Sequence, residues 1–129
     1  MDIKILSVWE AIKFKPEVKT AAMRIFNGDE DPSLNRDYMP LVVSNNYIGQ
    51  FLYVFDDIQQ MTADQVEEAS RQQPDEEPDN VYFSRDIARQ IITDFVSVRD
   101  RIECLMVHCK YGQGRSPAVA MALNEGFNL

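Results

Sequence analysis

Residues 107–117, with the sequence VHCKYGQGRSP, join a short apolar run to a helical pattern. The apolar run at residues 104–107 is typical of a buried strand, and the residues from Pro117 to Leu123 are typical of a helix. Two glycines between these segments permit a tight turn, and a proline fits the first turn of a helix because its missing N–H costs no hydrogen bond. The segment therefore predicts a strand, a glycine-containing loop and a helix in direct succession.

The rest of the chain also alternates between strand-like and helix-like segments. The pattern predicts strands at residues 3–8, 21–26, 51–55 and 104–107, and helices at residues 9–14, 62–71, 85–101 and 117–123. Such alternation indicates an α/β fold with a mainly parallel sheet of four or five strands flanked by helices. The length of 129 residues fits one domain spanning residues 1–129. Ligands of parallel sheets bind beyond the carboxyl ends of the strands, where Cys109 and the pair Asp56 and Asp57 are expected.

The composition narrows the classes of partner. The chain has a net charge of −8, so nonspecific attraction to nucleic acid or to an anionic membrane is not expected. No signal peptide is recognised at the N-terminus, and the apolar runs are too short to span a membrane.

The two cysteines are expected to remain free thiols. Cys104 and Cys109 lie five positions apart in sequence, which is roughly 16 Å along one extended strand. A disulfide needs Cα atoms about 4.4–6.8 Å apart. Free thiols without an export signal predict a cytoplasmic protein. We expect Cys104 to be a buried small hydrophobe, and a role as redox partner of Cys109 is the alternative.

The loop has the parts needed to surround a phosphate dianion. Gly112 and Gly114 allow positive φ and close approach to a ligand, so that consecutive backbone N–H groups can form an anion-binding nest. The N-terminus of the following helix adds partial positive charge, and Arg115 can bind two phosphate oxygens at once. The same positive field should lower the pKa of Cys109 and make its thiolate a nucleophile.

The neighbouring side chains suggest further roles. We expect Ser116 to hydrogen-bond the sulfur, and His108 to order the loop by hydrogen bonding instead of acting as a base. Lys110 either adds charge at the mouth of the site or is simply solvated, and Tyr111 either lines the site or packs on a neighbouring loop. The predicted substrate-binding residues are Lys110, Tyr111, Gly112, Gln113, Gly114 and Ser116.

The pattern His-Cys-x-x-Gly-x-x-Arg-Ser at residues 108–116 resembles the signature of cysteine-based protein tyrosine phosphatases, particularly the compact dual-specificity branch. The Arg-Ser-Pro ending also matches members of that branch. The wider resemblance covers about residues 50–125, and the layout looks like that of short bacterial or phage predicted tyrosine phosphatases. The resemblance implies hydrolysis of a phosphomonoester, most often phosphotyrosine on a protein, through a phosphocysteine intermediate. It implies no metal or other cofactor, and one histidine with two poorly spaced cysteines gives no zinc pattern.

The resemblance also implies an aspartic acid that protonates the leaving oxygen, a contribution of typically 10²–10⁴-fold. Its position after a strand selects Asp57, with Asp56 as the near alternative. No Trp-Pro-Asp loop occurs in the chain, so the position after residues 51–55 is the basis of this assignment.

Two alternatives to a protein phosphatase remain open from the sequence. Lys110 and the Gly-x-Gly-Arg ending also resemble lipid phosphatases of this superfamily, although Gln113 stands where some of those carry a second lysine. A noncatalytic phosphate-binding module is the other alternative. Only twelve residues follow Pro117, fewer than in most family members, which suggests a C-terminally truncated form or one that needs a partner. Gly126 is expected to cap the last helix.

Overall fold

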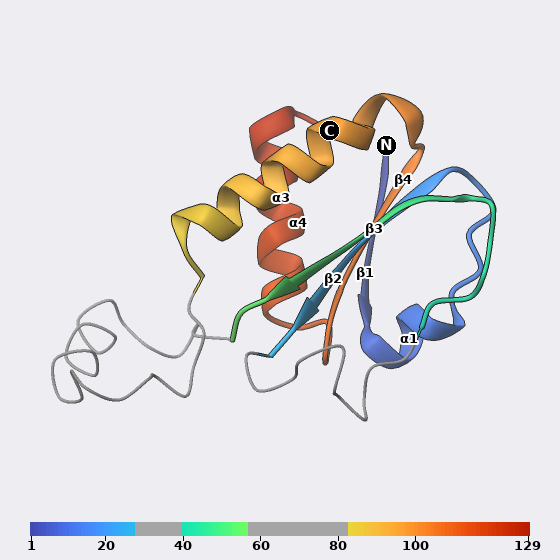
Figure 1. Cartoon of the computed structure of the whole chain (residues 1–129), viewed down its shortest axis with the longest axis horizontal. Coiled ribbons are helices and arrows are strands. Elements are labelled where there is room, and N and C mark those ends of the chain that lie inside the picture. Colours follow the sequence, from blue (N-terminus) through green and yellow to red (C-terminus); the bar gives the residue numbers. More distant parts are fainter. Residues whose placement is uncertain (28–39, 57–82) are drawn as a thin grey trace, which may run out of the picture.

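The computed structural model describes residues 1–27, 40–56 and 83–129 of the chain (Figure 1). The predicted helix at residues 62–71 lies outside these ranges. Within the described residues, four strands form one all-parallel sheet in the order β1-β4-β2-β3. Their bounds are Asp2–Ser7 for β1, Thr20–Phe26 for β2, Tyr47–Val54 for β3 and Cys104–Cys109 for β4. The predicted α/β class is therefore confirmed.

The two central strands, β4 and β2, are the most buried. Every residue of β2 and of β4 is buried, as expected for parallel strands covered on both faces. Strand β3 begins four residues earlier than predicted, because the Gly49 and Gln50 that interrupt the apolar pattern still pair with β2. Both cysteines are buried and free, and they occupy opposite ends of β4.

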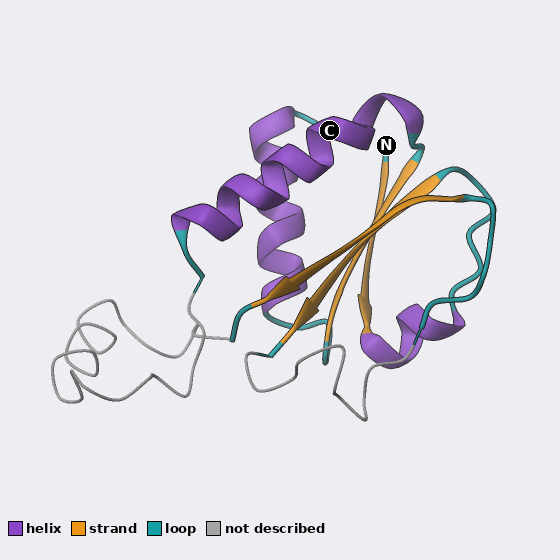
Figure 2. Cartoon of the chain, in the orientation of Figure 1, coloured by secondary structure: helices purple, strands orange, loops and turns teal. Residues whose placement is uncertain are grey.

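In the described part of the chain, three α-helices cover the sheet: α1 at Val8–Lys13, α3 at Arg85–Val98 and α4 at Arg115–Phe127. Helices α3 and α4 lie on one side of the sheet and α1 lies on the other (Figure 2). A 3-10 turn at Arg99–Arg101 extends α3. Ser84 caps α3 through the backbone N–H of Ile87, and the helix begins at residue 85 as predicted. None of the helices in the described part of the chain is long and apolar enough to cross a membrane.

The two ends of α4 differ from the prediction. The helix begins at Arg115, two residues before Pro117, so the loop runs directly into its first turn. Gly126 lies inside the helix and does not cap it. Asn128 takes the left-handed conformation that ends the helix, with φ of 54°, and its N–H bonds to the carbonyl of Asn124. Asparagine tolerates this conformation better than most residues, which is why it replaces the expected glycine.

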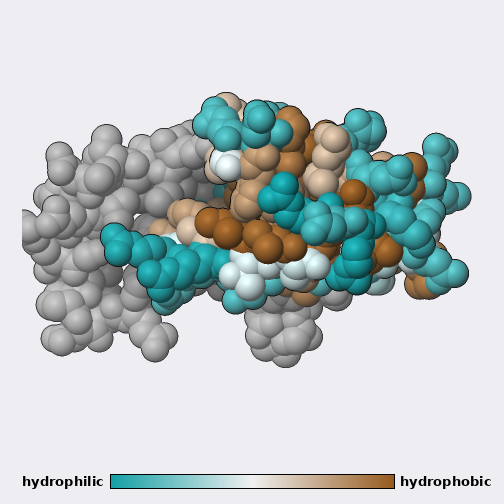
Figure 3. All heavy atoms as spheres, turned by 90° about the horizontal axis from the view of Figure 1, so that it is seen from above, coloured by the Kyte–Doolittle hydropathy of each residue, from teal (hydrophilic) through white to brown (hydrophobic). Residues whose placement is uncertain are grey.

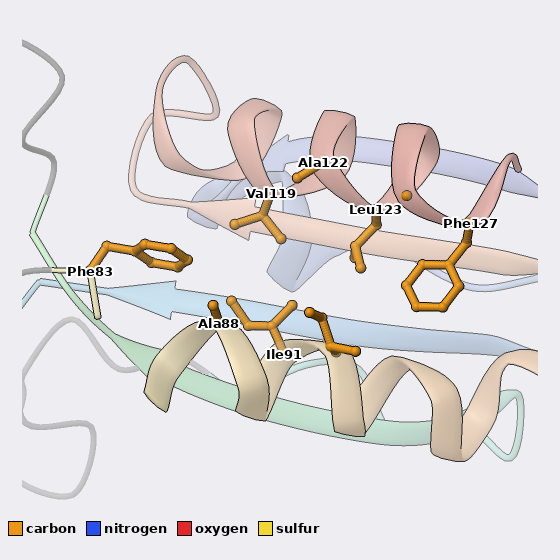
Figure 4. Close-up of a pocket in the computed structure, with 9 residues that line it drawn as sticks. Phe83, Ala88, Ile91, Val119, Ala122, Leu123 and Phe127 are labelled. Carbon is orange, nitrogen blue, oxygen red and sulfur yellow. The ribbon is translucent and has the colours of Figure 1, made fainter. Parts of the chain in front are cut away.

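Helices α3 and α4 face each other across an open apolar groove (Figure 4). Apolar atoms also gather between hydrophilic ones on this side of the molecule (Figure 3). The residues that line the groove include Phe83, Ala88, Ile91, Val119, Leu123 and Phe127. Apolar side chains of α3 and of α4 pack into the same core. This packing fixes the position of α4 and therefore of the loop that precedes it.

Candidate active site

The loop between β4 and α4 lies at the carboxyl edge of the sheet. Cys109 is the last residue of β4, and it pairs in register with Ser7, the last residue of β1. Ser7 also caps α1, so the start of α1 adjoins the same edge. The carbonyl of Lys110 accepts a 3.2 Å hydrogen bond from the N–H of Val8. The loop is thus held between two helix N-termini and two strand ends.

Cys109 is almost fully buried, with 2 % of its surface exposed. Its Sγ lies 3.2 Å from the Ser116 hydroxyl oxygen and accepts a 3.2 Å hydrogen bond from the N–H of Gly112. Burial raises the pKa of the thiol, but hydrogen bonds from the Ser116 hydroxyl and from the N–H groups of Ser116, Gly112 and Gly114 outweigh it. The net pKa lies below the usual value for cysteine, which favours the thiolate.

The early start of α4 explains part of this effect. The N–H groups in the first turn of a helix have no partner within the helix. Because the helix begins at Arg115, the N–H of Ser116 belongs to that turn and is directed at the sulfur. The hydroxyl of Ser116 interacts with Sγ as the sequence predicts, and Ser116 itself is fully buried.

Of the two loop glycines, Gly112 has a positive φ and Gly114 does not. Gly112 has a φ of 72°, and a Cβ there would lie 2.9 Å from the backbone of Leu6 and Ser7. A side chain at this position would therefore be strained and would collide with rigid backbone. Gly114 has a φ of −125°, so it does not use the positive φ that glycine allows. Gly114 is instead the N-cap of α4, a position that also favours glycine.

Arg115 connects the loop to the end of β3. Its side chain is 7 % exposed, and its Nη1 donates a 2.9 Å hydrogen bond to the carbonyl of Phe55. Its buried Nε has no hydrogen-bond partner within the described ranges. A buried guanidinium with an unused donor suits an anion, which would accept from it.

Asp56, the alternative candidate for the acid, comes directly after the residue that makes this contact. Phe55 is followed by Asp56, which is partly buried and is the last described residue before the gap. Asp57, the predicted acid, lies outside the described residues. The hydrogen bond from Arg115 to Phe55 therefore joins the residue before Asp56 to the loop between β4 and α4.

The rim of the loop has exposed side chains. Tyr111 is 63 % exposed and lies against Trp9 of α1, with ring centroids 5.8 Å apart. The Lys110 ammonium is 5.7 Å from the centroid of the Tyr111 ring, and Gln113 is exposed. Tyr111 thus packs on a neighbouring element and stays accessible at the same time. Trp9 was not predicted as a site residue, although its place two residues after the end of β1 puts it at this edge.

His108 and Arg24 form a buried pair behind the loop. Both side chains are fully buried, and Arg24 Nε donates a 2.8 Å hydrogen bond to His108 Nε2. The role of His108 as a hydrogen-bonding residue agrees with this arrangement. Arg24 was not predicted as a site residue. Its signal in the sequence is a charged residue inside an otherwise apolar strand.

Within the described residues, no group of three or more His, Cys, Asp or Glu side chains is arranged to hold a metal ion. Comparison of the chain with protein-family models, with curated proteins and with solved structures found no significant match. The family resemblance therefore stays a prediction from residues 108–116.

Proposed function

We propose that the protein hydrolyses phosphomonoesters through a phosphocysteine intermediate, as a cysteine-dependent phosphatase. The observation that carries the proposal is the convergence on one loop of a buried thiol with lowered pKa and a buried guanidinium with an unused donor. Cys109 supplies the nucleophile and Arg115 supplies a fixed charge for the oxyanion. Both come from a segment of seven residues, so their separation is set by one tight loop and not by distant elements.

The proposed reaction has two steps. In the first, the Cys109 thiolate attacks phosphorus, the P–O ester bond breaks and the leaving oxygen takes a proton from a carboxylic acid. Arg115 and the N–H groups of the loop bind the equatorial oxygens. In the second, water attacks phosphorus and gives its proton to the same carboxylate. The S–P bond then breaks, Ser116 donates to the departing thiolate, and inorganic phosphate leaves.

Asp57 is the proposed acid, with Asp56 as the alternative. The supporting contact is the hydrogen bond from Arg115 to Phe55, which lies one residue before Asp56. Replacement of the true acid should slow the first step by about 10²–10⁴-fold for a poor leaving group. It should have less effect on an aryl phosphate with a good leaving group, because that oxygen needs less protonation.

The rim favours an aromatic leaving group. Trp9 and Tyr111 present accessible ring surface beside the loop, and aromatic surfaces pack well on a planar ring. We therefore propose a phosphotyrosine residue of a protein as the substrate class, within a dual-specificity-like phosphatase. Lys110 is the one lysine in the loop, and the chain as a whole has a net charge of −8. Both features give less support to a phosphoinositide substrate. We also propose a cytoplasmic location because both cysteines are free.

The proposal is tested by turnover of an aryl phosphate by the wild type and by Cys109→Ser. We expect turnover by the wild type and none by Cys109→Ser, with both proteins folded by circular dichroism. Folded wild type that binds phosphate without turnover would support the noncatalytic phosphate-binding alternative. Asp57→Asn and Asp56→Asn should then be compared on a phosphotyrosine peptide. The larger loss of kcat identifies the acid.

A further inference from the structure

The buried pair of Arg24 and His108 takes no part in the two reaction steps described above. The two residues are cross-strand partners on β2 and β4, and neither is exposed to solvent. Side chains alternate along a strand, so both lie on the face of Ala22 and Met106, opposite α3 and α4. A fully buried arginine is uncommon, and the Nε of this one is paired with His108.

The hydrogen bond from Arg24 determines which nitrogen of His108 carries a proton. Arginine does not deprotonate in proteins, and its Nε has a single hydrogen to donate. His108 Nε2 must accept that hydrogen at 2.8 Å, so Nε2 carries none. A neutral imidazole then has its proton on Nδ1, which lies 3.4 Å from the carbonyl oxygen of Cys109. His108 is therefore a donor toward the residue that supplies the nucleophile.

Protonation of both ring nitrogens is disfavoured by the same surroundings. Burial lowers the pKa of His108 to about 4, and the charges of Arg24 and Arg115 lower it as well. The hydrogen bond to the carbonyl of Cys109 acts in the opposite direction. The ring is consequently neutral in the physiological range of pH, in the one tautomer that Arg24 permits.

The direction of the Cys109 carbonyl matters for the phosphate loop. In a trans peptide, the C=O and the following N–H point in opposite directions. A Cys109 carbonyl held toward His108 therefore turns the N–H of Lys110 to the other side of the chain. Val8 holds the Lys110 carbonyl in the same way, which orients the N–H of Tyr111. Carbonyls held in this way would direct the N–H groups that follow them into the loop, as an anion-binding nest requires.

We propose that Arg24 is a positioning residue, which fixes His108 in the Nδ1–H tautomer so that it holds the Cys109 carbonyl outward and the loop N–H groups inward. The proposal rests on the proposed function for its catalytic meaning. Arg24 acts through His108 and does not touch the substrate. Its side chain also lies over the Phe26 ring, with 5.3 Å from the guanidinium carbon to the ring centroid, which helps to fix its position.

The tautomer can be measured directly because His108 is the only histidine in the chain. In protein labelled with ¹⁵N-histidine, we expect a protonated Nδ1 and an unprotonated Nε2 near neutral pH. Arg24→Met keeps an unbranched side chain but removes the Nε–H donor. We therefore expect it to shift the His108 ring toward the other tautomer. Arg89→Met, at an exposed position on α3, is the matched control and should leave the spectrum unchanged. A wild-type ring protonated on Nε2, or a spectrum unchanged by Arg24→Met, would overturn the proposal.

Two substitutions of His108 separate its two contacts. The amide nitrogen of asparagine can replace Nδ1 as donor, and the amide oxygen of glutamine can replace Nε2 as acceptor. We expect His108→Gln to lower the rate of Cys109 alkylation by iodoacetamide by roughly three- to tenfold, the effect of about one hydrogen bond. His108→Asn should keep the rate within about twofold of the wild type. The reverse order would overturn the proposal, even if Arg24→Met does not fold.

The coupling between the two residues gives a final check. Arg24→Met should slow alkylation in the wild type and have no further effect in His108→Asn, where the donor no longer depends on Arg24. An equal effect in both backgrounds would show that Arg24 acts without His108. Neither alkylation nor the tautomer requires turnover of a phosphate ester. A protein that passes these tests but hydrolyses no aryl phosphate would refute the proposed function alone.

Discussion

Arg115 Nη1 donates a 2.9 Å hydrogen bond to the carbonyl oxygen of Phe55, so the cationic end of the loop is joined to the residue before Asp56. One guanidinium group can hold this carbonyl and an anion at once because its donors point in different directions. The contact links the two parts of the site that come from distant regions of the sequence, the loop after β4 and the end of β3.

Arg115→Lys should therefore impair catalysis although it keeps the positive charge. A lysine ammonium cannot bind two oxygens of phosphate in the planar geometry of arginine while also bonding to Phe55. We expect kcat/KM for an aryl phosphate to fall by about 10²–10³-fold, the effect of losing a fixed donor to the oxyanion. Arg89→Lys should leave steady-state kinetics unchanged. Retention of most activity by Arg115→Lys would show that the guanidinium geometry is not used.

Ser116→Ala should raise the pKa of Cys109, because it removes the hydroxyl hydrogen bond to the sulfur while the backbone N–H groups remain. The thiolate population and the alkylation rate should then fall at pH values just above the wild-type pKa. The two proteins should react equally at high pH, where both thiols are ionised. Iodoacetamide alkylation followed across a pH series measures this shift. An unchanged pH profile would show that the hydroxyl does not stabilise the thiolate.

Gly112 and Gly126 make a matched pair of substitutions. Gly112→Ala places a Cβ 2.9 Å from the backbone of β1 at a positive φ, so we expect a loss of unfolding free energy of about 1–3 kcal/mol or more and a large loss of activity. Gly126→Ala lies within α4 and meets no atom within 4 Å, so it should stabilise the protein by about 0.5–1 kcal/mol. Urea unfolding of both variants measures the two effects. Equal stabilities would contradict the role of Gly112 in closing the loop against β1.

The sheet and its helices follow from patterns that the sequence shows directly. Apolar runs predicted all four described strands, and the helical pattern from residue 85 predicted the start of α3, which Ser84 caps. The sequence pattern predicts the start of α4 two residues too late, because Pro117 fits the first position of a helix. A proline fits anywhere in the first turn, where N–H groups have no helical partner. The two extra residues, Arg115 and Ser116, are the ones that place donors on the sulfur.

The partners of the site were harder to predict than the loop itself. Arg24 and Trp9 lie far from residues 108–116 in sequence, and only the strand order β1-β4-β2 brings them to either side of β4. A cross-strand pair such as Arg24 and His108 depends on register, which apolar patterns do not determine for strands buried on both faces. Asp57 stays a prediction because it lies outside the described residues.

The pH dependence of stability should show the buried His108. Its pKa is about 4 in the folded protein, mainly through burial, against about 6.5 for an unperturbed histidine. Below about pH 6.5 the unfolded chain binds a proton that the folded protein does not, so the free energy of unfolding falls with pH until about 4. The loss attributable to this residue is about 3 kcal/mol. Urea unfolding between about pH 7 and 4 measures this loss. The change in unfolding free energy of His108→Gln over the same pH range is subtracted, because it contains the contribution of the carboxylates alone. Parallel curves for the two proteins would contradict a buried neutral imidazole.

The aromatic rim predicts a selective effect on substrates. Trp9→Ala or Tyr111→Ala removes ring surface beside the loop but none of the groups that bind phosphate. We expect each to lower kcat/KM for a phosphotyrosine peptide by roughly two- to tenfold, the effect of one aromatic contact, and to leave an alkyl phosphate such as a phosphoserine peptide nearly unchanged. Met121→Ala, exposed on α4, is the control and should affect neither substrate. An equal loss for both substrates would mean that the two rings support the loop instead of the leaving group. The contact joins Trp9 of α1 to Tyr111 of the loop, so it could serve only to hold the loop in place. A loss confined to the phosphotyrosine peptide would show that the two rings also take part in substrate recognition.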